Sequence, residues 1–166
     1  MNITRTLACF FGIHVIGLLA YTADCSGQDF NGDGTPDFIE AVAVAPGVPT
    51  TGAVVVRSGV DNAVLFVIEA PDPDDAFGWD FEILPDINGD GVPEIAVAAP
   101  RSHLWTDAIG RVFVHSGATG DRLFALRGRR GDRIGFTLGG SHDVNDDGVQ
   151  DIFATGMRLD QIGMPR

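Results

Sequence analysis

After residue 28 the chain carries short apolar stretches separated by glycine-rich turns, and it shows no amphipathic helix period. Residues 94–99 form an apolar run that Pro100 ends, and a run of this length predicts a buried strand. Residues 110–117 alternate between apolar and polar side chains, and a further apolar run at 122–127 follows a Gly-Ala-Thr-Gly turn. Strands separated by about 8–12 residues with glycine turns predict an all-β fold.

The strand pattern recurs along the chain with a constant period. The same plan occurs at 52–59 and 64–68, which is 58 residues before the stretch just described. Three copies of an acidic loop begin at Asp29, Asp86 and Asp143, so 57 residues separate each copy from the next. A fixed period of this length marks a repeat architecture. One period holds four strands and one acidic loop, which is the content of one propeller blade.

The acidic loops place oxygen atoms at the spacing that a calcium ion takes. Calcium binds six to eight oxygens from carboxylates, amides, backbone carbonyls and water, and a glycine allows the sharp turn around the ion. Loop positions 1, 3, 5 and 9 offer side-chain oxygens, and position 7 offers its backbone carbonyl. The predicted ligands of up to three Ca²⁺ ions are Asp29, Asn31, Asp33, Thr35 and Asp37; Asp86, Asn88, Asp90, Val92 and Glu94; and Asp143, Asn145, Asp147, Val149 and Asp151.

The same residues are compatible with two other kinds of loop. Asn, Asp and Gly also build turns without any metal, so an ion-free turn is the structural alternative for each loop. An EF-hand requires a glutamate at position 12 and flanking helices. Position 12 is Glu40, Val97 and Ala154 in the three copies, and the flanks have strand patterns, so the EF-hand is excluded.

The charge distribution favours cation binding. The net charge is −12, and nine carboxylates lie at predicted ligand positions, so the remaining residues carry only about −3. All 11 basic residues are arginines, and no basic face is evident, which argues against a nucleic-acid partner.

The motifs resemble the FG-GAP repeats of the integrin α-subunit β-propeller and their bacterial relatives. Phe77-Gly78 matches the "FG" element, Ala98-Ala99-Pro100 stands in for "GAP", and 110–120 matches the third strand and its turn. The last copy departs from the pattern, with Ile134-Gly135 in place of Phe-Gly. The resemblance covers about residues 29–157. It implies about two and a half four-stranded blades of an incomplete β-propeller, stapled by calcium and often extracellular and adhesive.

The N-terminal segment has the pattern of a secretory signal. Arg5 precedes an apolar stretch at 7–20, which is too short to span a bilayer as a helix. We therefore predict a signal peptide at 1–25, with cleavage somewhere in 20–28, and repeats over 26–166 of a chain that is secreted or held at the cell surface. The alternative is that 14–28 supply the first strand of the first blade. With Cys9 inside the signal and Cys25 alone or removed, we expect no intrachain disulfide.

The residues give no support for catalysis. Four histidines are present, His14, His103, His115 and His142, and Ser116 follows His115 on a strand, where adjacent side chains point to opposite faces. We therefore expect no enzyme active site. The predicted function is a secreted calcium-binding module for adhesion or for binding an extracellular protein or glycan.

Several points stay open from the sequence. Further blades in cis or in trans are expected partners, and no membrane span is expected in the mature chain. Trp105, in a polar loop, is a candidate contact residue or a structural one. The alternative functions are an accessory or partial domain of a larger extracellular polysaccharide-degrading enzyme, and a remnant without a function of its own.

Overall fold

A computed structural model of the chain describes residues 13–15, 18–23, 27–44, 52–72, 75–101, 109–147 and 150–157. The loop with Trp105 lies outside these residues, as does Val149. The described strands are β1 (Ile13–Val15), β2 (Leu18–Ala23), β3 (Phe38–Val44), β4 (Ala53–Arg57), β5 (Val64–Glu69), β6 (Phe81–Leu84), β7 (Glu94–Ala99), β8 (Arg111–His115), β9 (Arg122–Arg127), β10 (Ile134–His142) and β11 (Asp151–Gly156).

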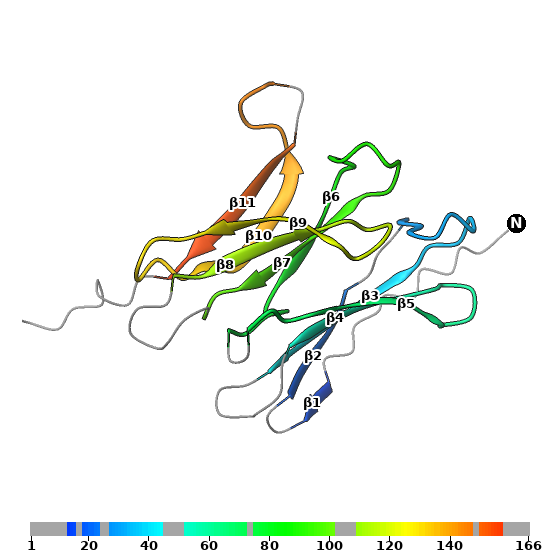
Figure 1. The fold of residues 1–166 in the computed structure, drawn as a ribbon, viewed down its shortest axis with the longest axis horizontal. Coiled ribbons are helices and arrows are strands. Elements are labelled where there is room, and N and C mark those ends of the chain that lie inside the picture. The colour runs from blue at the N-terminus through cyan, green and yellow to red at the C-terminus, as the bar shows by residue number, and fades with distance from the viewer. Residues whose placement is uncertain are drawn as a thin grey trace, which may run out of the picture.

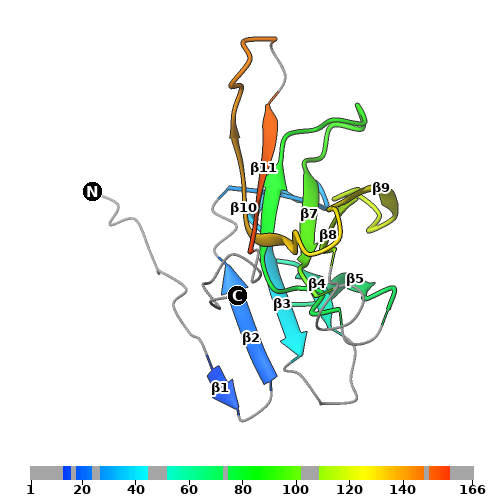
Figure 2. The same ribbon diagram turned by 90° about the vertical axis from the view of Figure 1, so that its left-hand side faces the viewer.

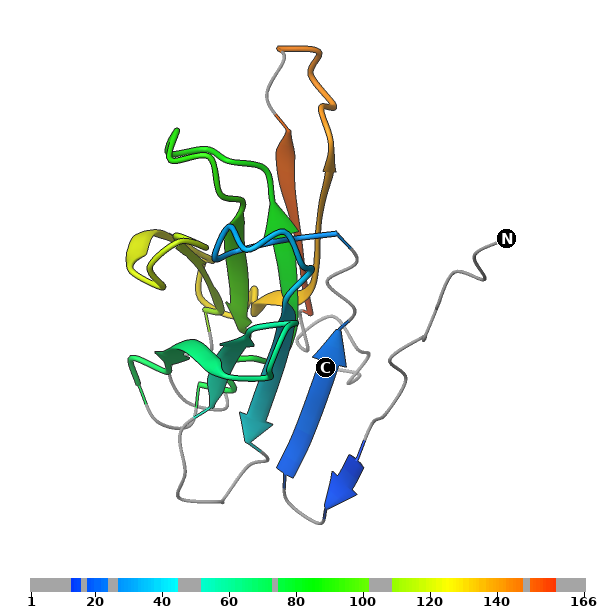
Figure 3. The same cartoon turned by 90° about the vertical axis from the view of Figure 1, so that its right-hand side faces the viewer.

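The strands form three antiparallel sheets in which chain neighbours pair (Figure 1). We call β2–β5, with β1 at the edge, blade 1; β6–β9, blade 2; and β10–β11, blade 3. The prediction of an all-β, incomplete propeller is confirmed: two blades have four consecutive strands, and within the described residues the sheets do not close into a ring (Figures 2 and 3). No described helix has the length and hydropathy that a membrane span requires.

Blades 1 and 2 share their strand register as well as their strand order. Phe38 pairs with Arg57 in blade 1, and its counterpart Ile95 pairs with His115 in blade 2. Each blade also has an irregularity in the pairing of its last two strands, just before Arg57 and just before His115. The sequence repeat is therefore a repeat of backbone geometry.

The first strand of blade 1 lies inside the segment predicted to be a signal peptide. Leu18–Ala23 forms β2 and pairs with β3, which is the arrangement of the alternative reading. The register of the β2–β3 pair differs by two residues from that of the first two strands in the other blades. Phe81 pairs with Val97 in blade 2, whereas Glu40, which corresponds to Val97, pairs with Thr22. Cleavage of residues 1–25 stays a prediction.

Two apolar clusters join the blades. The first lies between blades 1 and 2, and its rings include Phe77 and Phe113, whose centroids are 5.7 Å apart. The second lies between blades 2 and 3 and includes Val112, Val114 and Leu138. Alternation along each strand produces both clusters, because successive side chains of β7 and β8 face opposite neighbours.

Polar contacts also tie blade 2 to blade 3. The Asp80 carboxylate accepts a hydrogen bond from the Leu138 backbone N–H at 2.8 Å. The Trp79 ring nitrogen donates to the Phe136 carbonyl at 3.3 Å, and the two rings lie 5.4 Å apart. These contacts position β10 on blade 2.

Candidate metal centre

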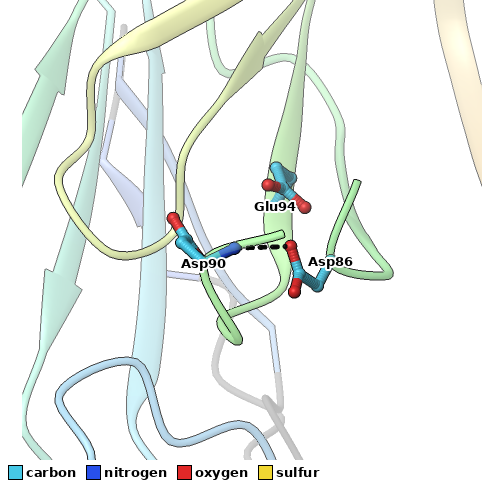
Figure 4. A group of neighbouring side chains, drawn as sticks. All are labelled: Asp86, Asp90 and Glu94. Carbon is cyan, nitrogen blue, oxygen red and sulfur yellow. Dashed lines mark hydrogen bonds between the residues drawn. The ribbon is translucent and has the colours of Figure 1, made fainter. Parts of the chain in front are cut away.

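Three carboxylates come together in the acidic loop of blade 2. One carboxylate oxygen from each of Asp86, Asp90 and Glu94 lies within 4.8 Å of the others (Figure 4). Each acidic loop joins the first and second strands of its blade, so the three loops lie at the same end of the sheets (Figure 1). In blade 2 the loop runs from the end of β6 to Glu94, the first residue of β7.

The loop winds around the Asp86 carboxylate. One Asp86 oxygen accepts hydrogen bonds from the backbone N–H groups of Gly89 at 2.6 Å and Asp90 at 3.2 Å, and the other accepts from Gly91 at 2.8 Å. Gly89 and Gly91 have φ values of 83° and 87°, a region that glycine enters without steric cost. The two glycines therefore let the backbone wrap around the Asp86 carboxylate without the help of a bound ion.

Asp90 is held in its ionised form. Its oxygens accept hydrogen bonds from the Asn88 side-chain amide and from the Val92 backbone N–H, each at 2.8 Å. The Asn88 and Val92 hydrogen bonds, in that order, lower the pKa of Asp90 below its usual value. An exposed, ionised carboxylate at position 5 is available to a cation.

Glu94 carries the strongest structural indication of a cation. Its side chain is fully buried, and one oxygen, Oε2, accepts a hydrogen bond from the Ile87 backbone N–H at 2.8 Å. The other oxygen, Oε1, has no hydrogen-bond partner. Burial raises the pKa of Glu94, backbone hydrogen bonding, first from Ile87, opposes that rise, and the negative charges of Asp86 and Asp90 add to it, so that the pKa lies above its usual value.

The residues of this loop fit a hard divalent cation. An unsatisfied buried carboxylate oxygen costs free energy, and a cation removes that cost because it supplies the missing positive partner. The donor set consists of oxygens alone, which suits calcium better than the softer transition metals. Glu94, Asp86 and Asp90 would hold the ion.

Blade 1 has the same loop but uses its last carboxylate differently. Asp29 accepts hydrogen bonds from the N–H groups of Gly32, Asp33 and Gly34. The buried Asp37, at the position of Glu94, accepts from the Phe30 N–H with one oxygen and from the Gly59 N–H with the other. Both Asp37 oxygens are therefore occupied by backbone donors, and Asp37 does not cluster with Asp29 and Asp33.

The loop before β11 keeps part of this pattern. The Asp147 N–H donates to the side chains of Asp143 at 3.1 Å and Asn145 at 2.9 Å, and the Val144 N–H donates to Asp151 at 2.8 Å. Asp146 has φ 59° at the position that Gly32 and Gly89 occupy in the other copies. Aspartate tolerates this region better than most residues, so the same turn is retained.

The structure places the predicted ligands as three loops of one type and brings carboxylates together in one of them. The side-chain amides of Asn31 and Asn145 donate hydrogen bonds to Asp33 and Asp147, just as Asn88 donates to Asp90. The backbone N–H groups of Asp33 and Asp147 donate back to the amide oxygens of the same asparagines. Thr35 and Val92, at position 7, donate their N–H groups to the position-5 aspartate. Val149 lies outside the described residues.

Ser116 is a site residue that sequence reasoning missed. Its hydroxyl group donates to the Asp90 carboxylate at 3.3 Å from the turn between β8 and β9, 26 residues away. Ser58-Gly59 and Ser116-Gly117 stand at equivalent places in the two blades. That recurrence was the available signal, although it could not show that the hydroxyl reaches the acidic loop.

His115 takes a structural role. Its Nδ1 lies 2.9 Å from the Gly120 carbonyl oxygen, and its ring meets the edge of Phe77 at 6.3 Å. Burial lowers the pKa of His115, so the ring is neutral at pH 7. It packs in the blade 1–blade 2 interface beside the apolar cluster.

The family comparison agrees with this geometry. Residues 77–115 match the family model of the FG-GAP repeat, a span that includes β6, the blade 2 acidic loop, β7 and β8. The comparison found this repeat and no catalytic family. No curated protein is significantly similar to the chain. Residues 77–115 are thus an FG-GAP repeat, and its acidic loop holds the three clustered carboxylates.

Proposed function

We propose that the chain is a secreted, non-catalytic calcium-binding module that presents its propeller blades to an extracellular protein or glycan. One observation carries the calcium part of this proposal: the buried Glu94 oxygen without a hydrogen-bond partner, beside Asp86 and Asp90. A cation is the partner that this arrangement lacks. The FG-GAP match supports the proposal, because the matched repeat contains this loop.

The three loops bind calcium with different affinities. The blade 2 loop binds first, because its three carboxylates are already gathered. In blade 1 the ion competes with the backbone donors that hold Asp37. Occupancy therefore rises from one ion to as many as three with calcium concentration.

The extracellular location rests on the N-terminal pattern and on the affinity expected of such loops. Residues 1–25 have the charge and apolar length of a secretory signal. Calcium modules outside the cell work with dissociation constants of about 10⁻⁴–10⁻³ M, which suits exposed loops with few charged ligands. An adhesive or ligand-binding role follows from placing such a rigid, calcium-held scaffold outside the cell.

Calcium titration calorimetry on the full chain tests the metal proposal. We expect the calcium affinity of the tightest binding step to fall by about tenfold or more in Asp86→Asn and to be unchanged in Asp29→Asn. Only Asp86→Asn removes a carboxylate from the cluster of Asp86, Asp90 and Glu94. Asp61→Asn is the matched control, since Asp61 is an exposed aspartate outside the acidic loops. Equal effects of all three substitutions, or no calcium heat in the parent chain, would contradict the proposal.

A further inference from the structure

The acidic loops of blades 1 and 2 each contain an asparagine followed by a glycine, at loop positions 3 and 4. These pairs are Asn31-Gly32 and Asn88-Gly89, whereas the loop before β11 has Asn145-Asp146. The backbone nitrogen of the residue after an asparagine can attack the asparagine side-chain amide, and a glycine hinders that attack least, because it has no side chain. The three loops therefore share their turn but differ in the residue that carries the attacking nitrogen.

Both Asn-Gly pairs are open to solvent. Their four residues are exposed, and a Cβ atom added at either Gly32 or Gly89 would meet no atom within 4 Å. The pairs lie between strands, so no strand ladder holds them in place. Neither packing nor strand pairing therefore prevents the glycine nitrogen from approaching the asparagine side chain.

The blade 2 loop places two catalytic groups beside Asn88. The Gly89 N–H donates to an Asp86 carboxylate oxygen at 2.6 Å, and a base at this distance can accept the proton that the nitrogen has to lose. The Asn88 amide oxygen accepts a hydrogen bond from the Asp90 N–H at 2.8 Å. That donor polarises the amide and stabilises the negative charge that develops on its oxygen during the attack.

Blade 1 repeats the arrangement around Asn31. The Gly32 N–H donates to an Asp29 oxygen at 2.7 Å, and the Asp33 N–H donates to the Asn31 amide oxygen at 2.9 Å. The same base, nucleophile and oxyanion donor are therefore present in both loops.

The loop before β11 is a natural comparison. The Asp147 N–H donates to the Asn145 amide oxygen at 2.9 Å, as in the other two loops. The attacking nitrogen, however, belongs to Asp146, whose side chain crowds its approach. The donor to the amide oxygen is kept while the residue that carries the nucleophile changes.

We propose that Asn88 and Asn31 are sites of spontaneous deamidation and that Asn145 reacts far more slowly. The nitrogen of the following glycine bonds to the side-chain Cγ, the bond between Cγ and Nδ2 breaks, and ammonia leaves with the proton that the glycine nitrogen lost. Water from the solvent then opens the cyclic imide at one of its two carbonyl groups. The products are aspartate and isoaspartate.

The reaction changes the candidate metal centre. The Asn88 amide, which donates to Asp90 at 2.8 Å, becomes a carboxylate beside those of Asp86, Asp90 and Glu94. In the aspartate product the added charged ligand strengthens calcium binding, because affinity rises with the number of charged ligands. In isoaspartate the backbone is one methylene longer, so the position-3 group is displaced.

Calcium should slow the reaction at Asn88, and this part rests on the proposed function. A cation that takes Asp86 as a ligand competes with the Gly89 N–H for that carboxylate. The preference for Asn88 and Asn31 over Asn145 involves no ion. The two parts can therefore fail separately.

Peptide mapping of the full chain by mass spectrometry tests the site preference, after incubation in chelator and in millimolar calcium. Each deamidation raises the mass of its peptide, because a hydroxyl group replaces an amino group, and chromatography separates the two products. In chelator we expect Asn88 and Asn31 to react about tenfold or more faster than Asn145. Circular dichroism of the same samples shows whether the chain is folded.

Two reciprocal substitutions assign the preference to the following residue. Gly89→Asp gives the blade 2 loop the Asn-Asp pair and should slow the reaction at Asn88 about tenfold, with Asn31 in the same chain as the internal control. Asp146→Gly should raise the rate at Asn145 about tenfold. Asp146 has φ 59°, so glycine enters this place without strain, and this variant is informative even if Gly89→Asp misfolds.

Asp86→Asn tests the base. In chelator it should slow the reaction at Asn88 and leave Asn31, which has Asp29 beside it, unchanged. An equal or faster rate at Asn88 in a folded chain would overturn the role of Asp86.

The contrary outcomes are distinct. Equal rates at Asn88 and Asn145 in chelator would overturn the proposal, as would a folded Asp146→Gly chain in which Asn145 reacts no faster. Equal rates in calcium and chelator would overturn the protection by calcium if calorimetry detects calcium binding. If calorimetry detects none, they count against the proposed function, and faster reaction at Asn88 and Asn31 still supports the deamidation sites.

Discussion

A single methylene group separates the last acidic residues of the loops in blades 1 and 2. Asp37 and Glu94 are both buried, and each accepts a hydrogen bond from the backbone N–H that follows the first loop residue. The shorter Asp37 is also bonded to the N–H of Gly59, whereas Glu94 Oε1 has no partner. The longer side chain thus leaves one oxygen available to a cation, and the proposed order of calcium affinities rests on this difference.

Glu94→Gln should have opposite effects with and without calcium. In chelator we expect the variant to be more stable by about 1 kcal/mol, because a neutral amide replaces an unsatisfied buried carboxylate and can donate to Asp86 or Asp90. In millimolar calcium we expect it to be less stable than the parent, because a charged ligand is lost. Thermal unfolding in the two buffers measures both. A change of the same sign in both would refute the assignment of Glu94 as a ligand.

Asp75 should make stability depend on pH. It is buried at the start of blade 2, one oxygen accepts from the Phe77 N–H at 2.9 Å, and the other has no partner. Burial raises the pKa of Asp75 from 3.8 to about 6. Because the folded pKa exceeds the unfolded one, its contribution to stability is fully present below pH 3.8 and is lost as pH rises through 6.

Asp75→Asn should remove that dependence and stabilise the chain at pH 7 by about 1–2 kcal/mol, since the buried charge is gone. Urea unfolding in chelator between pH 4 and pH 8 measures it, with the exposed Asp61→Asn as control. An Asp75→Asn chain that loses stability between pH 4 and pH 8 as steeply as the parent would count against this role.

At the scale of strands and turns, the third strands of blades 1 and 2 are each preceded by a glycine pressed against the next blade. A Cβ atom at Gly52 would collide with the Phe77 carbonyl oxygen, and one at Gly110 with the Ile134 backbone. Phe77 and Ile134 are the first residues of the repeated Phe-Gly element. This close approach explains why the glycine and the Phe-Gly element recur together with the period of the repeat.

Gly110→Ala should destabilise the chain by about 3 kcal/mol or more, because backbone atoms would have to separate and φ is 67°. Gly131→Ala is the matched control, with φ 82° and open space around the position of its Cβ. It should cost about 1 kcal/mol, from backbone strain alone. Chemical denaturation measures both. Equal costs would mean that the blades do not meet closely at Gly110.

At the scale of the whole molecule, the sheets form an open stack with two different ends. Blade 3 ends in the free β11 edge within the described residues, and blade 1 begins with β2 in the predicted signal segment. Open stacks leave strand edges available for pairing with other chains. The sequence-based prediction of further blades, in cis or in trans, concerns these two edges.

Export should change the first of these ends. If the chain is secreted through its N-terminal signal, the intact mass of the mature protein should correspond to a start within 20–28, and part or all of β2 (Leu18–Ala23) should be missing. Removal of β2 would expose the edge of β3, to which it pairs. Mass spectrometry of the exported protein decides this, with the unprocessed protein from inside the cell as the reference. A mature chain that starts at Met1 would mean that β2 is a permanent strand of blade 1.

Much of the architecture was predictable because it depends on local spacing. Strand alternation, the 57-residue period and the glycine turns are all read within a few residues, and they predicted the all-β repeat that the structure has. The winding of each loop around its first aspartate is also local, since the donors to Asp86 lie three to five residues away. The sequence by itself determined the repeat, the strand order and the candidate ligands.

Tertiary structure alone decided which carboxylates come together. Asp37 is held by Gly59, 22 residues away, and Asp90 receives a hydroxyl group from Ser116, 26 residues away. It also decided that Leu18–Ala23 pairs with β3. These outcomes depend on contacts between segments that are distant in sequence, and such contacts are set by how the sheets pack on one another.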